Sequence, residues 1–148
     1  MNPVRSMRVN KFVLDNNIWV SYFITKRVLI LLEIIDRHKL VVFSCDELLE
    51  EVKRVLNYPH LKKYKVDISS ALKIVKGATT HCELLYPIKR YIPTDAADDY
   101  LIALALQTSS GFITSGDDDI LSQKDTLEKK YKKLTILTKK EFEEMFDR

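Results

Sequence analysis

The sequence predicts an α/β fold in three layers, with a central parallel sheet of about five strands flanked by helices. Two observations support this fold class. Five short apolar runs have the length of buried strands, and stretches with helical periodicity lie between them. Connections between parallel strands are almost always right-handed crossovers, so this alternation predicts one sheet covered on both faces.

The five expected strands are short apolar runs without strict alternation. Strands buried on both faces of a parallel sheet read this way, because both sets of side chains lie in the core. The runs are KFVLD (11–15), KLVVF (39–43), CELLY (82–86), GFITS (111–115) and LTILT (134–138).

The expected helices carry apolar residues on one face, at a period of 3.6 residues. Ser44 with Glu47, and Thr138 with Glu141, match the Ser/Thr-x-x-Glu capping box and therefore predict helix starts. A further helix is expected to begin near Asn17. The other helices are expected over 25–37, 45–57, 67–80, 97–108 and 139–146.

Length and composition indicate one globular domain. The chain has 148 residues, of which 46% are hydrophobic and 30% charged, with no internal repeat and no linker rich in Gly or Pro. We expect the domain to cover residues 11–148 and residues 1–10 to be a leader or an expression remnant, because Met7 would make an equally good start. The net charge of +3 is compatible with a polyanionic partner without establishing one.

The expected location is the cytoplasm, without membrane attachment. No apolar run reaches the roughly 18 residues of a membrane span, and the N-terminal residues lack the apolar centre of a signal peptide. Cys45 and Cys82 form no CxxC pair and have no histidine at metal spacing, so we expect reduced thiols and no zinc. The histidines His38, His60 and His81 lie in no motif and are expected to be structural or exposed.

Acidic residues cluster where a parallel sheet collects its functional groups, just past the carboxyl ends of strands. Asp15 ends the first expected strand, where the roles of helix cap and active-site acid are equally compatible with the sequence. Capping explains one acid of the cluster that begins PTDAADD, but not all three. The acids concerned are Asp15, then Asp95, Asp98 and Asp99, and finally Asp117, Asp118 and Asp119 behind the fourth strand.

A divalent cation is the economical explanation for this convergence. Carboxylates that lie close together raise one another's pKa unless a positive charge compensates them. Oxygen ligands without Cys or His indicate a hard ion, Mg²⁺ or Mn²⁺. A calcium loop beginning at Asp117 is excluded, because its fifth position is Leu121 and its sixth, where the turn needs glycine, is Ser122.

Four pieces of the sequence, in order, resemble the PIN-domain family, and more narrowly the VapC-type toxins of prokaryotic toxin-antitoxin systems. They are VLDNN, SCDELLEEVKRVL, DAADDYLIALAL and FITSGDDDIL, and LTILTKKEF resembles the family's closing strand and helix. The resemblance covers the chain from Lys11 to Phe146 and implies the three-layer PIN-like fold. Two departures are mild: Asn16 stands where the family has threonine, and Ser115 replaces the threonine of Thr-Gly-Asp.

The resemblance implies a metal-dependent endoribonuclease with one or two Mg²⁺ or Mn²⁺ ions. It makes Asp15, Glu51, Asp98 and Asp117 the catalytic acids, and Asp15, Asp98, Asp117 and Asp119 the metal ligands. Asn17, Asp99 and Ser115 would support them, with Asp99 an alternative third acid. Asp95 would cap the helix or lie outside the ligand shell. Glu47 and Glu50 are expected on a solvated helix face, and Asp118 is expected to face solvent.

The implied partners are RNA, a small antitoxin protein and a second copy of the chain. An acidic pocket needs flanking basic groups to accept an anion, and Lys129, Lys130, Lys132 and Lys133 follow the acidic loop. Other basic groups are Lys62, Lys63 and Lys65, and the pair Lys89 and Arg90. Tyr91 and Tyr100 flank the third acidic cluster, where they could stack on a base or pack in the core.

Two other functions compete with the nuclease. A haloacid-dehalogenase-like phosphohydrolase also pairs an Asp after a strand with a later Gly-Asp-Asp loop, but it needs an acid where Asn17 stands. The second alternative is a non-catalytic PIN-fold module that binds RNA or protein. Metal-dependent cleavage of RNA would separate them from the nuclease.

Overall fold

The chain forms a five-stranded, all-parallel sheet with helices on both faces, which confirms the predicted fold class. The computed structural model describes residues 10–93 and 96–146. The strand order is β3-β2-β1-β4-β5. The strands are β1 (Lys11–Leu14), β2 (Val41–Ser44), β3 (Thr80–His81), β4 (Phe112–Thr114) and β5 (Thr135–Leu137).

The chain builds the sheet outward from β1 in two directions. It proceeds through β2 and β3 on one side, then crosses back and adds β4 and β5 on the other. The order therefore reverses between β1 and β4, and open α/β sheets bind ligands outside the carboxyl ends of the strands at such a point. Two of the expected acidic groups, those after β1 and after β4, flank this point.

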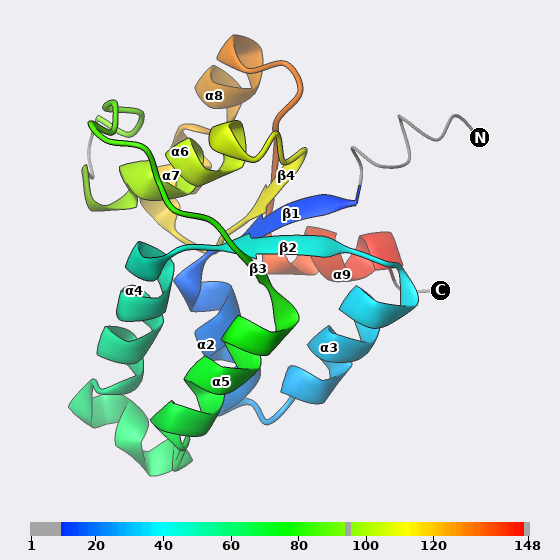
Figure 1. The fold of residues 1–148 in the computed structure, drawn as a ribbon, viewed down its shortest axis with the longest axis vertical. Helices are drawn as coiled ribbons and strands as arrows, with labels where there is room; N and C mark the ends of the chain where they lie inside the picture. The colour runs from blue at the N-terminus through cyan, green and yellow to red at the C-terminus, as the bar shows by residue number, and fades with distance from the viewer. Residues whose placement is uncertain (1–9, 94–95, 147–148) are drawn as a thin grey trace.

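The positions of the helices follow from the two directions in which strands are added. Right-handed crossovers that run in opposite directions place their helices on opposite faces of the sheet. Figure 1 shows α2 (Asn16–Ile24), α3 (Val28–Arg37), α4 (Asp46–Leu56) and α5 (Ile68–Ala78) on one face. The other face carries α6 (Asp99–Gln107), α7 (Asp118–Ser122) and α8 (Lys124–Lys130), and α9 (Lys139–Phe146) returns to the first face. Within the described residues no helix is long and apolar enough to cross a membrane.

Four of the five expected strands are confirmed to within two residues at either end, and the third is wrong. The edge strand β3 is Thr80–His81, and the run 82–86 continues as a loop. Leu84 is buried, but Leu85 and Tyr86 are exposed and the backbone N–H of Leu85 donates to Gln107 Oε1 on α6 (3.0 Å). The apolar run was mistaken for a strand because one of its side chains enters the core from a loop.

The expected helix over 25–37 is shorter than predicted, and two short helices were not predicted. The chain turns at Lys26, whose φ is +59°, between α2 and α3. The unpredicted α7 and α8 have only five and seven residues, too few for a clear periodic pattern. Short 3₁₀ turns at Pro59–Tyr64 and Ala96–Asp98 complete the described helical segments.

One of the two predicted capping boxes forms. Thr138 Oγ1 accepts the backbone N–H of Glu141 (3.1 Å), and Glu141 Oε1 accepts the N–H of Thr138 (2.9 Å), which starts α9 as expected. At the start of α4 the prediction is wrong: Ser44 Oγ pairs with Thr79 Oγ1 (2.7 Å), and the cap residue is Cys45. Ser44 is the last residue of β2, where its side chain meets the end of α5.

An aromatic cluster joins β1, β4 and α9 at the centre of the sheet. The Phe12 ring is inaccessible to solvent, stacks on Phe112 at 4.7 Å between centroids, and meets Phe142 edge-on at 5.6 Å. It also meets Phe146 edge-on at 5.7 Å. Because the strand that carries Asp15 packs through this ring, the cluster fixes the position of the acidic edge.

Replacing Phe12 with alanine is expected to lower the free energy of unfolding by about 3–5 kcal/mol, the usual cost of deleting a buried phenyl ring. Urea denaturation followed by circular dichroism measures it. Leu29→Ala on α3 is the matched control, because Leu29 is 76% exposed, and its cost is expected to stay within about 0.5 kcal/mol. Equal losses in both variants would contradict the role of the cluster.

Candidate active site

The ends of β1 and β4 lie next to each other and carry the two acids that flank the reversal of strand order. The backbone N–H of Asp15 donates to the carbonyl of Thr114 (2.9 Å), which extends the pairing of the two strands by one residue. Asp117 follows three residues after Thr114 and caps α7, accepting the N–H of Asp119 on Oδ1 (2.8 Å). The structure thus brings both acids to the carboxyl ends of β1 and β4, the part of the sheet called the acidic edge here.

Asp15 has no solvent exposure and accepts four hydrogen bonds. Its Oδ1 accepts the backbone N–H of Asn16 (2.6 Å) and the Asn16 side-chain amide (3.1 Å). Its Oδ2 accepts the Asn17 amide (3.2 Å) and the Ser115 hydroxyl (2.7 Å). A carboxylate has about four lone-pair sites, so these donors use its capacity. Asp15 therefore both caps α2 and is the most buried acid of this edge.

Ser115 and Asn17 connect the two strand ends. The Ser115 hydroxyl donates to Asp15 and accepts the backbone N–H of Asp117 (3.0 Å), so it holds the two acids in a fixed relative position. Asn17 donates to Asp15 and accepts the N–H of Gly116 (3.0 Å). Of the two hydroxyls that could replace the family's threonine, Ser115 makes these contacts, whereas Thr114 Oγ1 is buried without a hydrogen-bond partner.

The environment of Asp15 opposes its ionisation. Its pKa is raised to about 6, mainly by burial and to a lesser extent by the charge of Asp117, although the hydrogen bonds from Ser115 and Asn16 act in the opposite direction. The two carboxylates are close in the fold, because Ser115 Oγ contacts both Asp15 Oδ2 and the backbone N–H of Asp117. A positive charge at this edge would relieve the repulsion.

Asp98 and Asp99 have different roles at the start of α6. Asp99 is buried and ties down the preceding loop, because its Oδ1 accepts the N–H groups of Tyr91 (2.9 Å) and Ile92 (2.7 Å). Its Oδ2 pairs with Arg90 Nε at 3.1 Å. Asp98 is also buried, at 7% exposure, and is the N-cap residue that immediately precedes α6. Asp95, which was expected to cap this helix, lies outside the described residues.

The Tyr100 hydroxyl is a buried group whose pKa is affected by acids from three elements. It is buried without a hydrogen-bond partner in the described structure. Burial is the main cause that raises its pKa, and the charges of Asp15, Glu51 and Asp98 each raise it as well. These acids come from the end of β1, from α4 and from the start of α6, and their charges act on the same hydroxyl. Tyr100 is too buried to stack on a base, and that alternative is excluded.

Glu51 and Asp119 are less buried members of the group. Glu51 lies on α4, half-buried, and its Oε2 pairs with Arg54 Nη2 at 2.7 Å. Asp119 is half-buried in the first turn of α7, whereas Asp118 is exposed, as expected. The buried thiol of Cys45 also lies near this edge, and burial raises its pKa to about 12, which leaves it protonated at neutral pH.

The structure places two of the expected substrate-binding lysines at the opposite edge of the sheet. Lys132 and Lys133 precede β5 and line a cavity together with Lys11, the first residue of β1, and Gly111, which precedes β4. Lys129 and Lys130 form the last turn of α8, which carries the chain away from the acidic loop. Closeness in sequence to Asp117 suggested closeness in space, but a helix separates the two.

The donor chemistry of the acidic edge fits a hard divalent cation, but the side chains as placed do not form a ready site. Among residues 10–93 and 96–146, no three Asp, Glu, His or Cys side chains are positioned to hold a metal ion. The hydrogen bonds explain this: Asp15 is saturated, Asp117 caps α7 and Glu51 pairs with Arg54. Binding a cation would require at least one of these contacts to be exchanged.

Sequence reasoning missed that the Tyr100 hydroxyl is a buried polar group whose pKa several of the acids raise. A partial signal exists, since Tyr100 follows Asp98 by two residues in a helix that is otherwise apolar. Which way the ring points could not be inferred, because i and i+2 positions lie on different faces of a helix. The Asn16 side chain was likewise missed as a donor to Asp15.

Without divalent cations, ionisation of Asp15 is expected to cost stability as the pH rises. Its folded pKa of about 6 exceeds the ordinary 3.8, so the folded chain holds the proton more tightly than the unfolded chain. This stability is present below pH 3.8 and is lost as the pH passes 6, by about 3 kcal/mol. Urea unfolding in EDTA across this range should show the loss in the wild type but not in Asp15→Asn.

The exposed Asp118→Asn variant is the control for that experiment, and its pH dependence is expected to match the wild type. Parallel curves for the wild type and Asp15→Asn would contradict the assignment to Asp15. In Mg²⁺ or Mn²⁺, a bound cation would stabilise the charged carboxylate, and the loss is expected to shrink.

Removing the Tyr100 hydroxyl is expected not to destabilise the protein. A buried hydroxyl without a partner costs about 1–3 kcal/mol of desolvation, so Tyr100→Phe should leave the free energy of unfolding unchanged or raise it. Denaturant titration in EDTA measures the difference. A loss of more than about 1 kcal/mol would mean that the hydroxyl has a stabilising partner in solution.

Comparison with known proteins agrees with this geometry. The chain is 29% identical over 146 residues to uncharacterized protein MJ1680 of Methanocaldococcus jannaschii, which covers 93% of this chain and 92% of that protein. The name of this relative assigns no activity. A family model described as PIN domain matches residues 11–119, from the first residue of β1 to the third aspartate after β4. The chain therefore belongs to the PIN domain family.

Proposed function

We propose that this PIN domain is a Mg²⁺- or Mn²⁺-dependent endoribonuclease whose catalytic edge lies at the carboxyl ends of β1 and β4. PIN domains are typically metal-dependent nucleases. The observation that supports the proposal is that Ser115 Oγ binds both the Asp15 carboxylate (2.7 Å) and the backbone N–H of Asp117 (3.0 Å), which places these two acids at adjacent strand ends. The charges of Asp15, Glu51 and Asp98 also all raise the pKa of the buried Tyr100 hydroxyl. Buried acids that perturb one another in this way are typical of functional sites.

Each acid would have a distinct part. Asp15, Asp98 and Asp117 would hold the cation, Asp119 would be an additional ligand, and Glu51 would complete the catalytic set. Asn17 and Ser115 keep Asp15 and Asp117 in register through the contacts described above. Asp99 supports the edge indirectly, since it fixes the loop before α6 and thereby the position of Asp98.

One or two bound ions would neutralise the carboxylates, polarise a phosphate oxygen and lower the pKa of a water molecule. The residues of the chain would orient the phosphodiester and exclude bulk water around Asp15. No histidine takes part: His81 pairs with exposed Asp46, His38 packs on Phe146 and His60 stacks with Tyr58.

The biological setting is also part of the proposal. By its likeness to VapC-type proteins, the chain would act in the cytoplasm as the toxin of a type II toxin-antitoxin system, with a small antitoxin protein as partner and with a second copy as a homodimer. Exposed apolar surface supports association with protein: Leu29 and Ile30 on α3 are 76% and 42% exposed. A gene for a small antitoxin beside this one would favour the same assignment.

The competing functions have less support. In a haloacid-dehalogenase-like site an acid would stand at Asn17, whose amide is committed to Asp15 and Gly116. A non-catalytic binding module would not require several acids to be buried at one edge, where their mutual repulsion costs stability.

Replacing Asp117 with asparagine is expected to abolish metal-dependent RNA cleavage while preserving the fold. Asparagine caps helices as well as aspartate does, so α7 should remain, and only the negative charge is lost. The loss should exceed the roughly 10–100-fold effects of changes outside a metal's ligand shell. Cleavage of a panel of labelled RNAs in Mn²⁺, in Mg²⁺ and in EDTA measures it.

Asp118→Asn is the matched control, because it removes the same charge one residue away from an exposed position. It is expected to cleave as the wild type does. Cleavage that persists in EDTA, or that both variants lose equally, would sink the proposed mechanism. Binding of RNA without cleavage under all these conditions would favour the non-catalytic module.

A further inference from the structure

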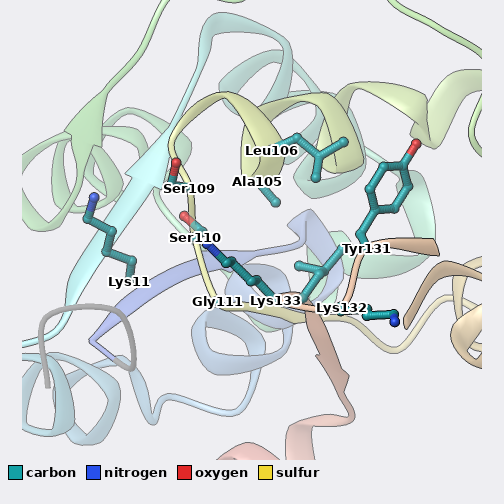
Figure 2. A pocket seen from close by; sticks show the side chains of 10 residues that line it. Lys11, Ala105, Leu106, Ser109, Ser110, Gly111, Tyr131, Lys132 and Lys133 are labelled. Atoms are coloured by element: carbon teal, nitrogen blue, oxygen red, sulfur yellow. The ribbon is translucent and has the colours of Figure 1, made fainter. Parts of the chain in front are cut away.

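A second candidate surface lies at the amino ends of the strands, whereas the acids lie at the carboxyl ends. A cavity of about 570 Å³ opens there, within the range of small-ligand sites. Its walls come from the end of α6, the turn before β4 and the segment before β5, as Figure 2 shows. None of the described acids that form the proposed catalytic edge lines it.

The cavity combines an apolar floor with an aromatic ring. The half-buried Leu106 provides aliphatic surface, the buried Ala105 and Leu134 lie behind it, and Gly111 presents bare backbone. The Tyr131 ring is half-buried, meets Tyr91 edge-on at 6.0 Å and lies below the Lys130 ammonium, 5.5 Å from the ring centroid. The ring is thus held in a fixed orientation at the cavity wall, as a stacking platform requires.

The charged groups of the lining are all basic. Lys132 and Lys133 are exposed, and neither forms an ion pair within the part of the chain that the structure describes. Figure 2 shows the Lys133 side chain directed toward the turn that holds Ser109 and Ser110, with the Tyr131 ring at the other end of the cavity. Lys11, the third lysine, is held by the carbonyl of Thr108 (3.4 Å).

We propose that this cavity binds an unpaired nucleotide of an RNA strand, with the base against Tyr131 and Leu106 and the phosphates on Lys132 and Lys133. The lining lacks acidic groups and therefore complements an anion, while the apolar floor and the ring complement the flat face of a base. A purely inorganic anion would leave the apolar floor uncovered, and an aliphatic ligand would leave the lysines without partners.

The cavity would anchor RNA at a distance from the catalytic edge. The two edges are separated by the length of the strands, about 13 Å for four residues. A single strand of several nucleotides could reach both, so that anchoring would restrict which phosphodiester meets the acids. Binding at the cavity needs no cation and is independent of whether the acidic edge cleaves RNA.

The test is the affinity of a fluorescently labelled uridine octamer, measured by anisotropy in EDTA so that cleavage cannot contribute. Lys132→Ala combined with Lys133→Ala is expected to weaken binding by about tenfold or more, and to lower the salt dependence by about 0.7 per lost phosphate contact. Tyr131→Leu is expected to weaken binding by about tenfold through lost stacking, with little change in salt dependence.

The matched control is Lys73→Ala combined with Lys76→Ala, which removes the same charge from exposed positions on α5, on the other face of the sheet. It should bind within about twofold of the wild type. Circular dichroism checks that all variants melt as the wild type does. An equal loss in the two lysine pairs would overturn the proposal, because it would indicate only general attraction between charges.

Two further ligands separate the proposed occupant from its rivals. An abasic strand of the same length should bind at least tenfold more weakly than the octamer, and Tyr131→Leu should not weaken it further. An acidic peptide or free uridine monophosphate that binds as tightly as the octamer would overturn the proposal in favour of a protein or a small molecule. Cleavage assays on the same variants are read separately, so a failed nuclease assay does not affect this outcome.

Discussion

The buried Asp15 carboxylate is the constraint on which the rest of the acidic edge depends. A charge without solvent exposure is tolerable only when hydrogen-bond donors replace water, and Asp15 receives four of them. Three come from the first turn of α2 and one from Ser115 after β4. The need to solvate one carboxylate therefore fixes the start of a helix and joins two strand ends that lie 100 residues apart.

The same arrangement explains why the edge is not a finished metal site. The donors that bind the Asp15 carboxylate would compete with a cation for its lone pairs. Asp117 and Glu51 also have partners: Asp117 accepts a hydrogen bond from the first turn of α7, and Glu51 forms an ion pair with Arg54. Mg²⁺ retains several of its waters and needs few direct protein ligands, so exchanging one or two of these hydrogen bonds would suffice. The Tyr100 hydroxyl is buried without a hydrogen-bond partner in the described structure, and the charges of Asp15, Glu51 and Asp98 raise its pKa, so it is a polar group that could still form a hydrogen bond.

The acids lie at the carboxyl ends of the strands and the lysines before β5 lie at the amino ends, and α8 connects the two regions. The acidic loop and the run of lysines are adjacent in sequence, and α8 carries the chain from one toward the other, about 10 Å for its seven residues. The net charge of +3 is therefore an average over an acidic region and a basic region, and it predicts the local charge of neither. An anionic strand would be repelled by the bare acids and attracted to the lysines, so the two edges would contribute differently to binding and to chemistry.

The sequence by itself determined the fold class, four of the five strands, and the acids that stand after β1 and β4. These follow from local signals: continuous apolar runs, helix periodicity, and the position of each acid relative to the run before it. Only the tertiary structure shows that Asp99 is bound to Arg90 and to the backbone of the loop before α6, because a difference of one residue turns a side chain to another side of the helix. It likewise decided that Tyr100 is buried, that Ser44 caps no helix, and that Lys132 and Lys133 lie across the sheet from Asp117. Each of these depends on contacts between residues far apart in the chain, which no local pattern records.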